Sequence, residues 1–90
     1  MGLQGDRKEE IATAVRDYLL EEVLPGEDPS ALTESTPLVS SGVLDSISTA
    51  RLVSHLENHF GIRLKASEVN AAHLDTVALI VNTVQSKLSS

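Results

Sequence analysis

Apolar residues recur at helical spacing in three stretches of the chain. In the first stretch the apolar positions are Ile11, Val15, Tyr18 and Leu19. Intervals of three and four place side chains on one face of an α-helix. We expect this helix to begin at Asp6, whose side chain can act as the N-cap, with Glu9 three residues later as in a capping box. Pro25-Gly26 then ends the helix.

The two later stretches have the same period. Their apolar positions are Leu52, Val53, Leu56 and Phe60 in one, and Val77, Ile80, Val81, Val84 and Leu88 in the other. Gly61 ends the second helix, because glycine readily takes the left-handed conformation that closes a helix C-terminus. Asp75 or Thr76 caps the third helix. Between the two, we expect Ser67 to cap a brief helix over residues 68–71.

The connection between the first and second helices covers residues 25–44. Its prolines and the segment Ser40-Ser41-Gly42 favour extended and turn geometry. A loop of this length is uncommon unless it is functional or packed, and we expect its apolar residues to anchor it over the helices. These residues are Leu32, Leu38, Val39 and Leu44. A short helical turn is expected near residues 30–32. The pattern predicts an all-α, four-helix bundle of three main helices plus one short helix, with a long loop between the first and second helices.

Composition narrows the class of protein. Ninety residues form one domain, residues 1–90, in which 1–5 are expected to be a tail. With 41% hydrophobic and 22% charged residues the chain is an ordinary globular domain, and with Tyr18 and Phe60 as its only aromatic residues the core must be aliphatic. The absence of cysteine excludes a disulfide framework and a thiolate metal site. No apolar run approaches the length of a membrane span, and the N-terminus lacks the apolar region of a signal peptide, so we expect a cytoplasmic protein. We also expect a monomer.

Charge is distributed unevenly. The net charge of −6 disfavours nucleic acid and anionic membranes as partners. Residues 1–45 hold ten acidic and three basic residues, whereas residues 46–90 hold three acidic and four basic ones. The acidic character therefore lies in the first helix and the long loop, and not in the second helix.

The start of the second helix is the candidate functional site. Asp45 is placed to act as the N-cap, with its carboxylate accepting a backbone N–H from the first turn. Ser46 is then the first helical residue, exposed at the positive end of the helix dipole. Free N–H groups and the dipole both favour an anion there, so this hydroxyl is well placed to carry a phosphate group.

The segment Gly42-x-Leu44-Asp45-Ser46-Ile47, followed by a helix that ends in Phe60-Gly61-Ile62, resembles the 4′-phosphopantetheine attachment region of the acyl and peptidyl carrier protein family. The family motif is Asp-Ser followed by Leu, Ile, Met or Phe, and the resemblance covers residues 8–88. It implies a small helical domain with a long loop between its first two helices, and a phosphopantetheinyl transferase that uses coenzyme A and Mg²⁺ to modify Ser46. Asp45 then helps to position the transferase and its metal.

By the same resemblance, the chain is a stand-alone, non-catalytic carrier that holds acyl or aminoacyl groups as thioesters. An acyl- or aminoacyl-loading ligase and downstream synthases, transferases or tailoring enzymes are the implied partners. They dock on exposed residues of the second helix, which correspond here to Ile47, Ala50, Arg51, Ser54, Glu57 and Asn58. Arg51 stands where carriers of fatty acid synthesis usually have an acid. This departure favours specialised metabolism, such as polyketide, nonribosomal peptide or aminoacyl pathways, with housekeeping fatty acid synthesis as the alternative.

Other functions remain open from the residues alone. An unmodified acidic helical adaptor would use Asp45-Ser46 only as a cap. A small hydrolase using Ser46 is disfavoured, because no base is identifiable near it in the sequence. His55 and His59 share a helix face at a spacing that suits a metal, but no third ligand is apparent and two solvated histidines are favoured. Ser40-Ser41-Gly42 lacks the setting of a nucleophile elbow and is interpreted as a turn.

Overall fold

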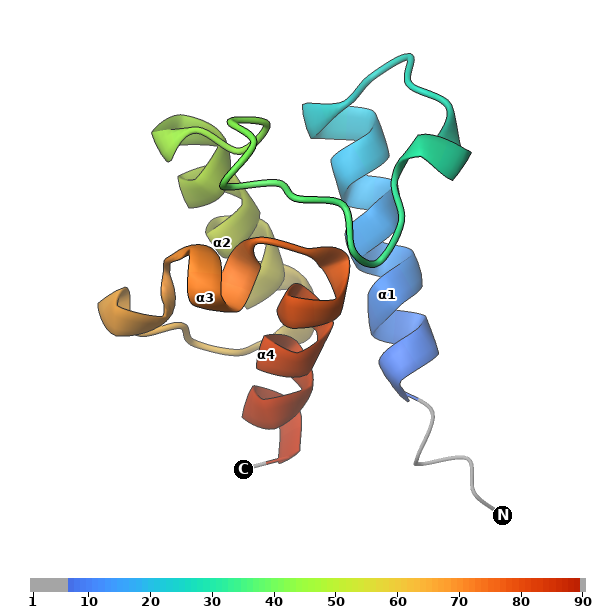
Figure 1. Cartoon of the computed structure of the whole chain (residues 1–90). Coiled ribbons are helices and arrows are strands. Elements are labelled where there is room, and N and C mark those ends of the chain that lie inside the picture. The colour runs from blue at the N-terminus through green and yellow to red at the C-terminus, as the bar shows by residue number, and fades with distance from the viewer. Residues whose placement is uncertain (1–6, 90) are drawn as a thin grey trace.

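The computed structural model describes residues 7–89, and every regular element in this range is helical (Figure 1). The α-helices are α1 (Arg7–Tyr18), α2 (Ser46–Phe60), α3 (Ala71–Leu74) and α4 (Val77–Ser89). Three shorter turns are η2 (Leu19–Val23), η3 (Pro29–Ala31) and η4 (Ala66–Glu68). The expected bundle of three main helices and one short helix is therefore confirmed. Within the described range, no helix is both long and apolar enough to cross a membrane.

The first helix ends where Pro25-Gly26 predicts. After Tyr18 it continues as the π-helical turn η2, and it stops at Val23. The expected cap Asp6 and the expected tail 1–5 lie outside the described residues.

The helices bury one aliphatic core. The main packing partner of α1 is α4, and α4 also contacts α2 and α3 (Figure 1). The core-facing positions predicted from periodicity are fully buried at Ile11, Val15, Leu19, Leu52, Leu56, Val77, Ile80 and Val84. The remaining predicted positions border this core, with Val81 6% exposed and Tyr18, Val53, Phe60 and Leu88 partly buried. The period alone thus identified which face of each helix turns inward.

The long loop, green in Figure 1, is packed against the helices rather than free in solvent. Leu32, Leu38 and Leu44 are at most 2% exposed, and Val39 is partly buried. The Arg16 guanidinium on α1 donates to the carbonyl groups of Leu32 and Pro29. The helical turn expected near residues 30–32 is η3, where the Asp28 carboxylate accepts the Ser30 N–H at 2.9 Å. All four apolar anchors of the loop are confirmed.

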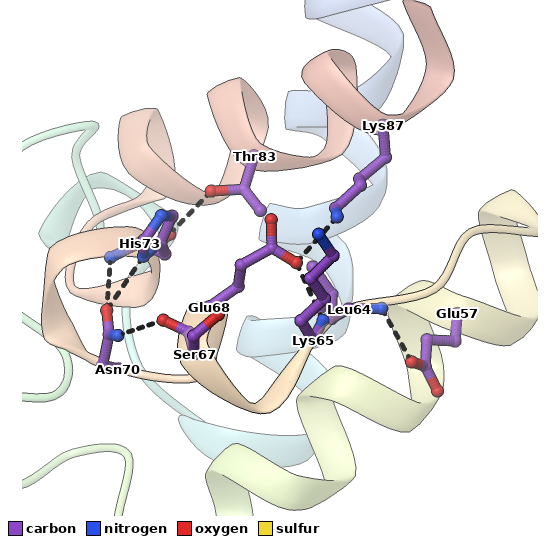
Figure 2. Close-up of polar contacts among 9 residues, drawn as sticks. All are labelled: Glu57, Leu64, Lys65, Ser67, Glu68, Asn70, His73, Thr83 and Lys87. Carbon is purple, nitrogen blue, oxygen red and sulfur yellow. Dashed lines mark hydrogen bonds and ion pairs between the residues drawn. The ribbon is translucent and has the colours of Figure 1, made fainter. Parts of the chain in front are cut away.

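The expectation of a helix capped by Ser67 is wrong. Ser67 lies inside the turn η4. Glu68 closes this turn, because its Oε1 accepts the Lys65 N–H at 2.8 Å (Figure 2). The same oxygen contacts Lys87 Nζ at 2.7 Å. The brief helix is α3, and its cap is Asn70, whose Oδ1 accepts the His73 N–H at 3.2 Å. Asparagine and serine are comparably good N-cap residues, so the local sequence suits a helix start at either Ser67 or Asn70.

Of the two caps proposed for the last helix, the structure selects Thr76. Its Oγ1 accepts the Leu79 N–H at 3.1 Å, and α4 begins at the next residue. Asp75 instead turns its carboxylate toward the long loop.

Candidate functional site

The site is built at the junction of the long loop and α2. Gly42 has a φ of +87°, a left-handed conformation that suits glycine, and it turns the chain toward the helix. Leu44 is buried and its N–H donates to the Leu38 carbonyl at 2.8 Å, which fixes the residue that precedes Asp45.

Asp45 is the N-cap of α2, as predicted. Its backbone is extended, and its Oδ1 accepts the Ser48 N–H at 2.8 Å. That hydrogen bond is the main reason that the pKa of the Asp45 carboxyl lies below its ordinary value. The site therefore presents an ionised, exposed carboxylate directly before Ser46.

Ser46 is the first residue of α2 and its side chain is exposed. Among residues 7–89, no hydrogen bond occupies its hydroxyl. The helix N-terminus adds free N–H groups and a partial positive charge, which favour a phosphate ester at this oxygen. An accessible hydroxyl at such a position fits covalent attachment of a phosphate-bearing group.

Open surface lies on both sides of Ser46. One shallow hollow, which we call the α1–α2 hollow, extends from Ser46 to α1 and is lined by Tyr18, Ser46, Ile47, Ala50, Arg51, Ser54 and His55. A second hollow extends from Ser46 toward the long loop and the segment before α3, where Val39, Val69 and Asn70 line it. A flexible arm attached to Ser46 would have room on either side.

Four of the expected docking residues gather on the α1–α2 hollow: Ile47, Ala50, Arg51 and Ser54. All four are exposed, and among the residues that the structure describes Ile47 is the large apolar residue most open to solvent, at 67%. Glu57 behaves differently, because it is half-buried and its Oε2 accepts the Leu64 N–H at 2.9 Å (Figure 2). This contact gives Glu57 a role in holding the segment after α2.

The wall of the second hollow is fixed by polar contacts around α3 (Figure 2). The Asn70 side chain donates to the Ser67 carbonyl at 2.7 Å, and Thr83 on α4 donates to the His73 carbonyl at 3.2 Å. Together with the Lys87–Glu68 ion pair, these contacts tie the segment that contains Val69 to α4. The surface beside Ser46 is therefore supported by α4.

The two histidines of α2 form an aromatic stack with Tyr18. The His55 ring lies 4.2 Å from the Tyr18 ring and 5.4 Å from the His59 ring, measured between centroids. No cluster of three or more His, Cys, Asp or Glu residues suited to a metal exists within the described range. His59 is exposed, as expected for a solvated histidine, but His55 is half-buried, so that expectation fails for it. Its ring links α2 to α1 through Tyr18.

Sequence reasoning missed the role of Asp75. Its Oδ1 accepts the backbone N–H groups of Leu38, Val39 and Ser40, and its Oδ2 accepts the Ser40 hydroxyl. The only local signal was a carboxylate at a helix boundary, which equally suits a cap.

We predict that protonation of His55 weakens the fold. Burial, followed by the nearby His59, lowers the pKa of His55, while Glu22 opposes this shift. As the pH falls through the ordinary value of 6.5, the unfolded chain takes up this proton before the folded chain does. The melting temperature should therefore fall by a few degrees between neutral pH and pH 5.5, and calorimetry measures it.

The control separates His55 from the other histidines. The His55→Gln variant should lose most of this pH dependence, whereas His73→Gln should retain it. An unchanged pH dependence in the His55→Gln variant would contradict the prediction.

Known proteins resemble this chain over most of its length. The family model described as "Phosphopantetheine attachment site" matches residues 13–84, a range that contains Ser46. D-alanyl carrier protein 1 of Lactiplantibacillus plantarum is 37% identical over 62 residues, which cover 69% of this chain and 76% of that protein. The D-alanyl carrier protein of Streptococcus sanguinis is 33% identical over 79 residues, which cover 88% of this chain and 91% of that protein.

A solved structure has the same fold. A chain from the crystal structure described as an FAD-dependent dehydrogenase superposes with a TM-score of 0.71 at 27% identity. The match covers 78% of this chain and 97% of that chain.

Proposed function

Because this chain belongs to the phosphopantetheine attachment-site family of carrier proteins, we propose that Ser46 is the residue that bears its 4′-phosphopantetheine group. The observation that carries this proposal is the exposed Ser46 hydroxyl at the N-terminus of α2, directly after the ionised cap Asp45. It lies inside the matched range and follows the family motif. No catalytic role is assigned to the chain.

In the proposed modification, the residues of this chain mainly position one oxygen. Ser46 Oγ attacks the pyrophosphate of coenzyme A and bonds to the phosphorus that carries the pantetheine arm, the P–O bond to the remaining phosphate breaks, and adenosine bisphosphate leaves. The Ser46 proton passes to a base of the transferase, and the positive end of the α2 dipole stabilises the phosphate charge. A phosphopantetheinyl transferase, with coenzyme A and Mg²⁺, provides the rest. When bound, the group supplies a flexible arm with a terminal thiol that holds a cargo as a thioester, which a chain without cysteine cannot supply itself.

We further propose that the cargo is aminoacyl. The support is twofold: the relatives named above are D-alanyl carrier proteins, and α2 lacks an acidic docking face because Arg51 is exposed and Glu57 is engaged with Leu64. A ligase that activates an amino acid would then load the thiol. Because the modification consumes coenzyme A, we place this carrier in the cytoplasm. A carrier of fatty acid synthesis and an unmodified adaptor are the competing functions.

The test is modification in vitro. The protein is incubated with coenzyme A, Mg²⁺ and a broad-specificity transferase, and its intact mass is measured. A gain of one phosphopantetheine, mapped by peptide mass to the segment that contains Ser46, supports the proposal. If a control carrier is modified under these conditions and this chain is not, the adaptor function replaces it.

Asp45 should contribute to both folding and modification. Asp45→Ala removes the cap of α2, so we expect the melting temperature to fall by about 4–8 °C. Asp45→Asn keeps an acceptor for the Ser48 N–H but removes the charge, so this variant should melt close to wild type and still be modified more slowly. Melting curves test the role of Asp45 in folding, and initial modification rates test its role in modification. If Asp45→Asn is modified at the wild-type rate, the role in modification is contradicted.

Arg51 should set the choice of partner. A basic patch that recognises an acidic helix would meet Arg51 as a like charge, and such charges mainly affect the encounter rate. Arg51→Glu should therefore speed acyl transfer with a ketosynthase of fatty acid synthesis several-fold and slow loading by the cognate ligase. Both effects should shrink as salt is raised.

The control for Arg51 is Arg63→Glu, which makes the same change of charge at an exposed position in the segment after α2. Its transfer rates should stay near wild type. If the wild-type protein already serves the fatty acid enzymes as well as their own carrier does, the specialised pathway is wrong and a housekeeping role replaces it.

A further inference from the structure

We infer that Asp75 is a positioning residue for Ser46, because its carboxylate holds the loop before α2 in the shape that the transferase binds. The inference rests on the proposed attachment at Ser46. It concerns a residue 29 positions away in the sequence, between α3 and α4.

One carboxylate holds three successive residues of the loop. Asp75 Oδ1 accepts the N–H groups of Leu38, Val39 and Ser40 at 3.1, 2.8 and 2.9 Å. Asp75 Oδ2 accepts the Ser40 hydroxyl at 3.0 Å, and the Asp75 carbonyl oxygen lies 2.6 Å from the Leu38 nitrogen. Figure 1 shows the loop passing beside the junction of α3 and α4. The Asp75 side chain therefore adds to the backbone contacts that attach the loop to the C-terminal half of the bundle, which include the Ala78 N–H donating to the Glu34 carbonyl at 3.2 Å.

Asp75 itself is fixed by the helices. Its N–H donates to the Ala71 carbonyl at 3.0 Å, and the next residue, Thr76, caps α4. A carboxylate anchored at two helix ends provides a rigid reference point for a segment that has few regular backbone hydrogen bonds of its own.

The contacts continue from the clamped residues to Ser46. The Val39 carbonyl accepts the Gly42 N–H at 3.1 Å, and the Leu38 carbonyl accepts the Leu44 N–H at 2.8 Å. Leu44 is followed by Asp45, the cap of α2, and then by Ser46. Two hydrogen bonds therefore separate the Asp75 carboxylate from the residue that precedes the cap.

Asp75 is ionised when it makes these contacts. The Ser40 N–H is the largest cause that lowers its pKa, and it outweighs the opposing effect of burial. Hydrogen bonds to an ionised acceptor are stronger than those between neutral groups, and successive N–H groups form a natural cradle for an anion. A related contact occurs at Asp28, the cap of η3, which accepts the N–H and the hydroxyl of one residue, Ser30, at 2.9 Å each and lies away from α2.

The consequence for modification is a cost of ordering. If the loop loses its anchor, the transferase must order it on binding, and this cost weakens binding without changing the chemical step. We expect Asp75→Ala to raise the KM for this carrier about tenfold and to change kcat by less than about twofold. Asp75→Asn keeps one acceptor oxygen and should restore most of the wild-type KM.

The experiment compares these two variants with Asp28→Ala, which removes a similar clamp elsewhere. Transferase kinetics give KM and kcat, and hydrogen exchange by NMR follows the amides of Val39, Ser40 and Leu44. We expect faster exchange at these amides and a raised KM in Asp75→Ala only. A folded Asp75→Ala with wild-type KM, or an equal rise in Asp28→Ala, overturns the inference.

Two further measurements keep the test decisive. If Asp75→Ala does not fold, Ser40→Ala removes only the contact with Oδ2, and it should raise both the KM and the exchange of the Ser40 amide; wild-type values overturn the inference. If the wild-type protein is not modified at all, the proposed function fails, whereas the exchange rates in Asp75→Ala still decide whether Asp75 holds the loop.

Discussion

Replacing Ser46 with alanine should abolish attachment of phosphopantetheine and leave the fold intact. The hydroxyl is exposed, and within residues 7–89 no hydrogen bond depends on it. Alanine is also a better helix former than serine at this first position of α2. The free energy of unfolding should therefore change by less than about 0.5 kcal/mol. Intact mass after incubation with the transferase and coenzyme A measures the first effect, and urea unfolding measures the second.

The control is Ser48→Ala, two residues further along α2. The main contact of Ser48 with Asp45 is its backbone N–H at 2.8 Å, which alanine keeps, while the smaller contribution of the Ser48 hydroxyl to Asp45 is lost. Ser48→Ala should be modified at close to the wild-type rate. Modification of Ser46→Ala at another serine would show that the attachment residue is misassigned, and equal loss in both variants would point to damage of the helix start.

The features that sequence predicted well are those determined by neighbouring residues. Asp45 as the cap, Ser46 as the first helical residue and Gly61 at the end of α2 are all present. Capping depends on a side chain and a backbone N–H three residues away, and helical periodicity depends on residues within two turns. These signals lie within a short stretch of sequence, so the candidate site could be located without knowing which residues surround it in the fold.

The features that sequence missed depend on distant residues. Asp75 and Thr76 are equally good caps by local rules, and the choice between them is made by three N–H groups of the long loop that only the fold brings to Asp75. Glu57 was likewise expected to be exposed, but it is half-buried because the chain after α2 turns back onto it. No helical period or motif links Asp75 to the loop or Glu57 to Leu64, so the sequence pattern does not indicate these contacts.

The long loop has one feature that the sequence predicted and another that it did not. Its apolar anchors could be recognised because a leucine in a polar segment has few reasons to be there unless it packs. Their burial was confirmed, with Leu38 fully buried. The pattern could not indicate that the same residue also connects Asp75 to Leu44 through its backbone N–H and carbonyl. Packing of the side chain and hydrogen bonding of the backbone therefore act on the loop at one position.

Leu38→Ala should be the most destabilising of these substitutions. Removing a fully buried leucine side chain loses its transfer free energy and leaves a cavity, which costs about 2–5 kcal/mol. Small domains have about 5–15 kcal/mol of stability in total, so this loss is a large share of it. The cavity would also lie beneath the clamped part of the loop, so we expect faster hydrogen exchange at the Leu44 amide even where the helices stay folded. Urea unfolding gives the free energy, and NMR gives the local exchange.

The matched control is Val39→Ala, at the next residue of the loop. Val39 is only partly buried, and its own N–H contact with Asp75 does not involve the side chain. The loss of stability there should be about 1 kcal/mol or less, because less apolar surface is removed from the interior. If Leu38→Ala costs no more than Val39→Ala, then the Leu38 side chain does not hold the loop, and it contributes little to presenting Ser46.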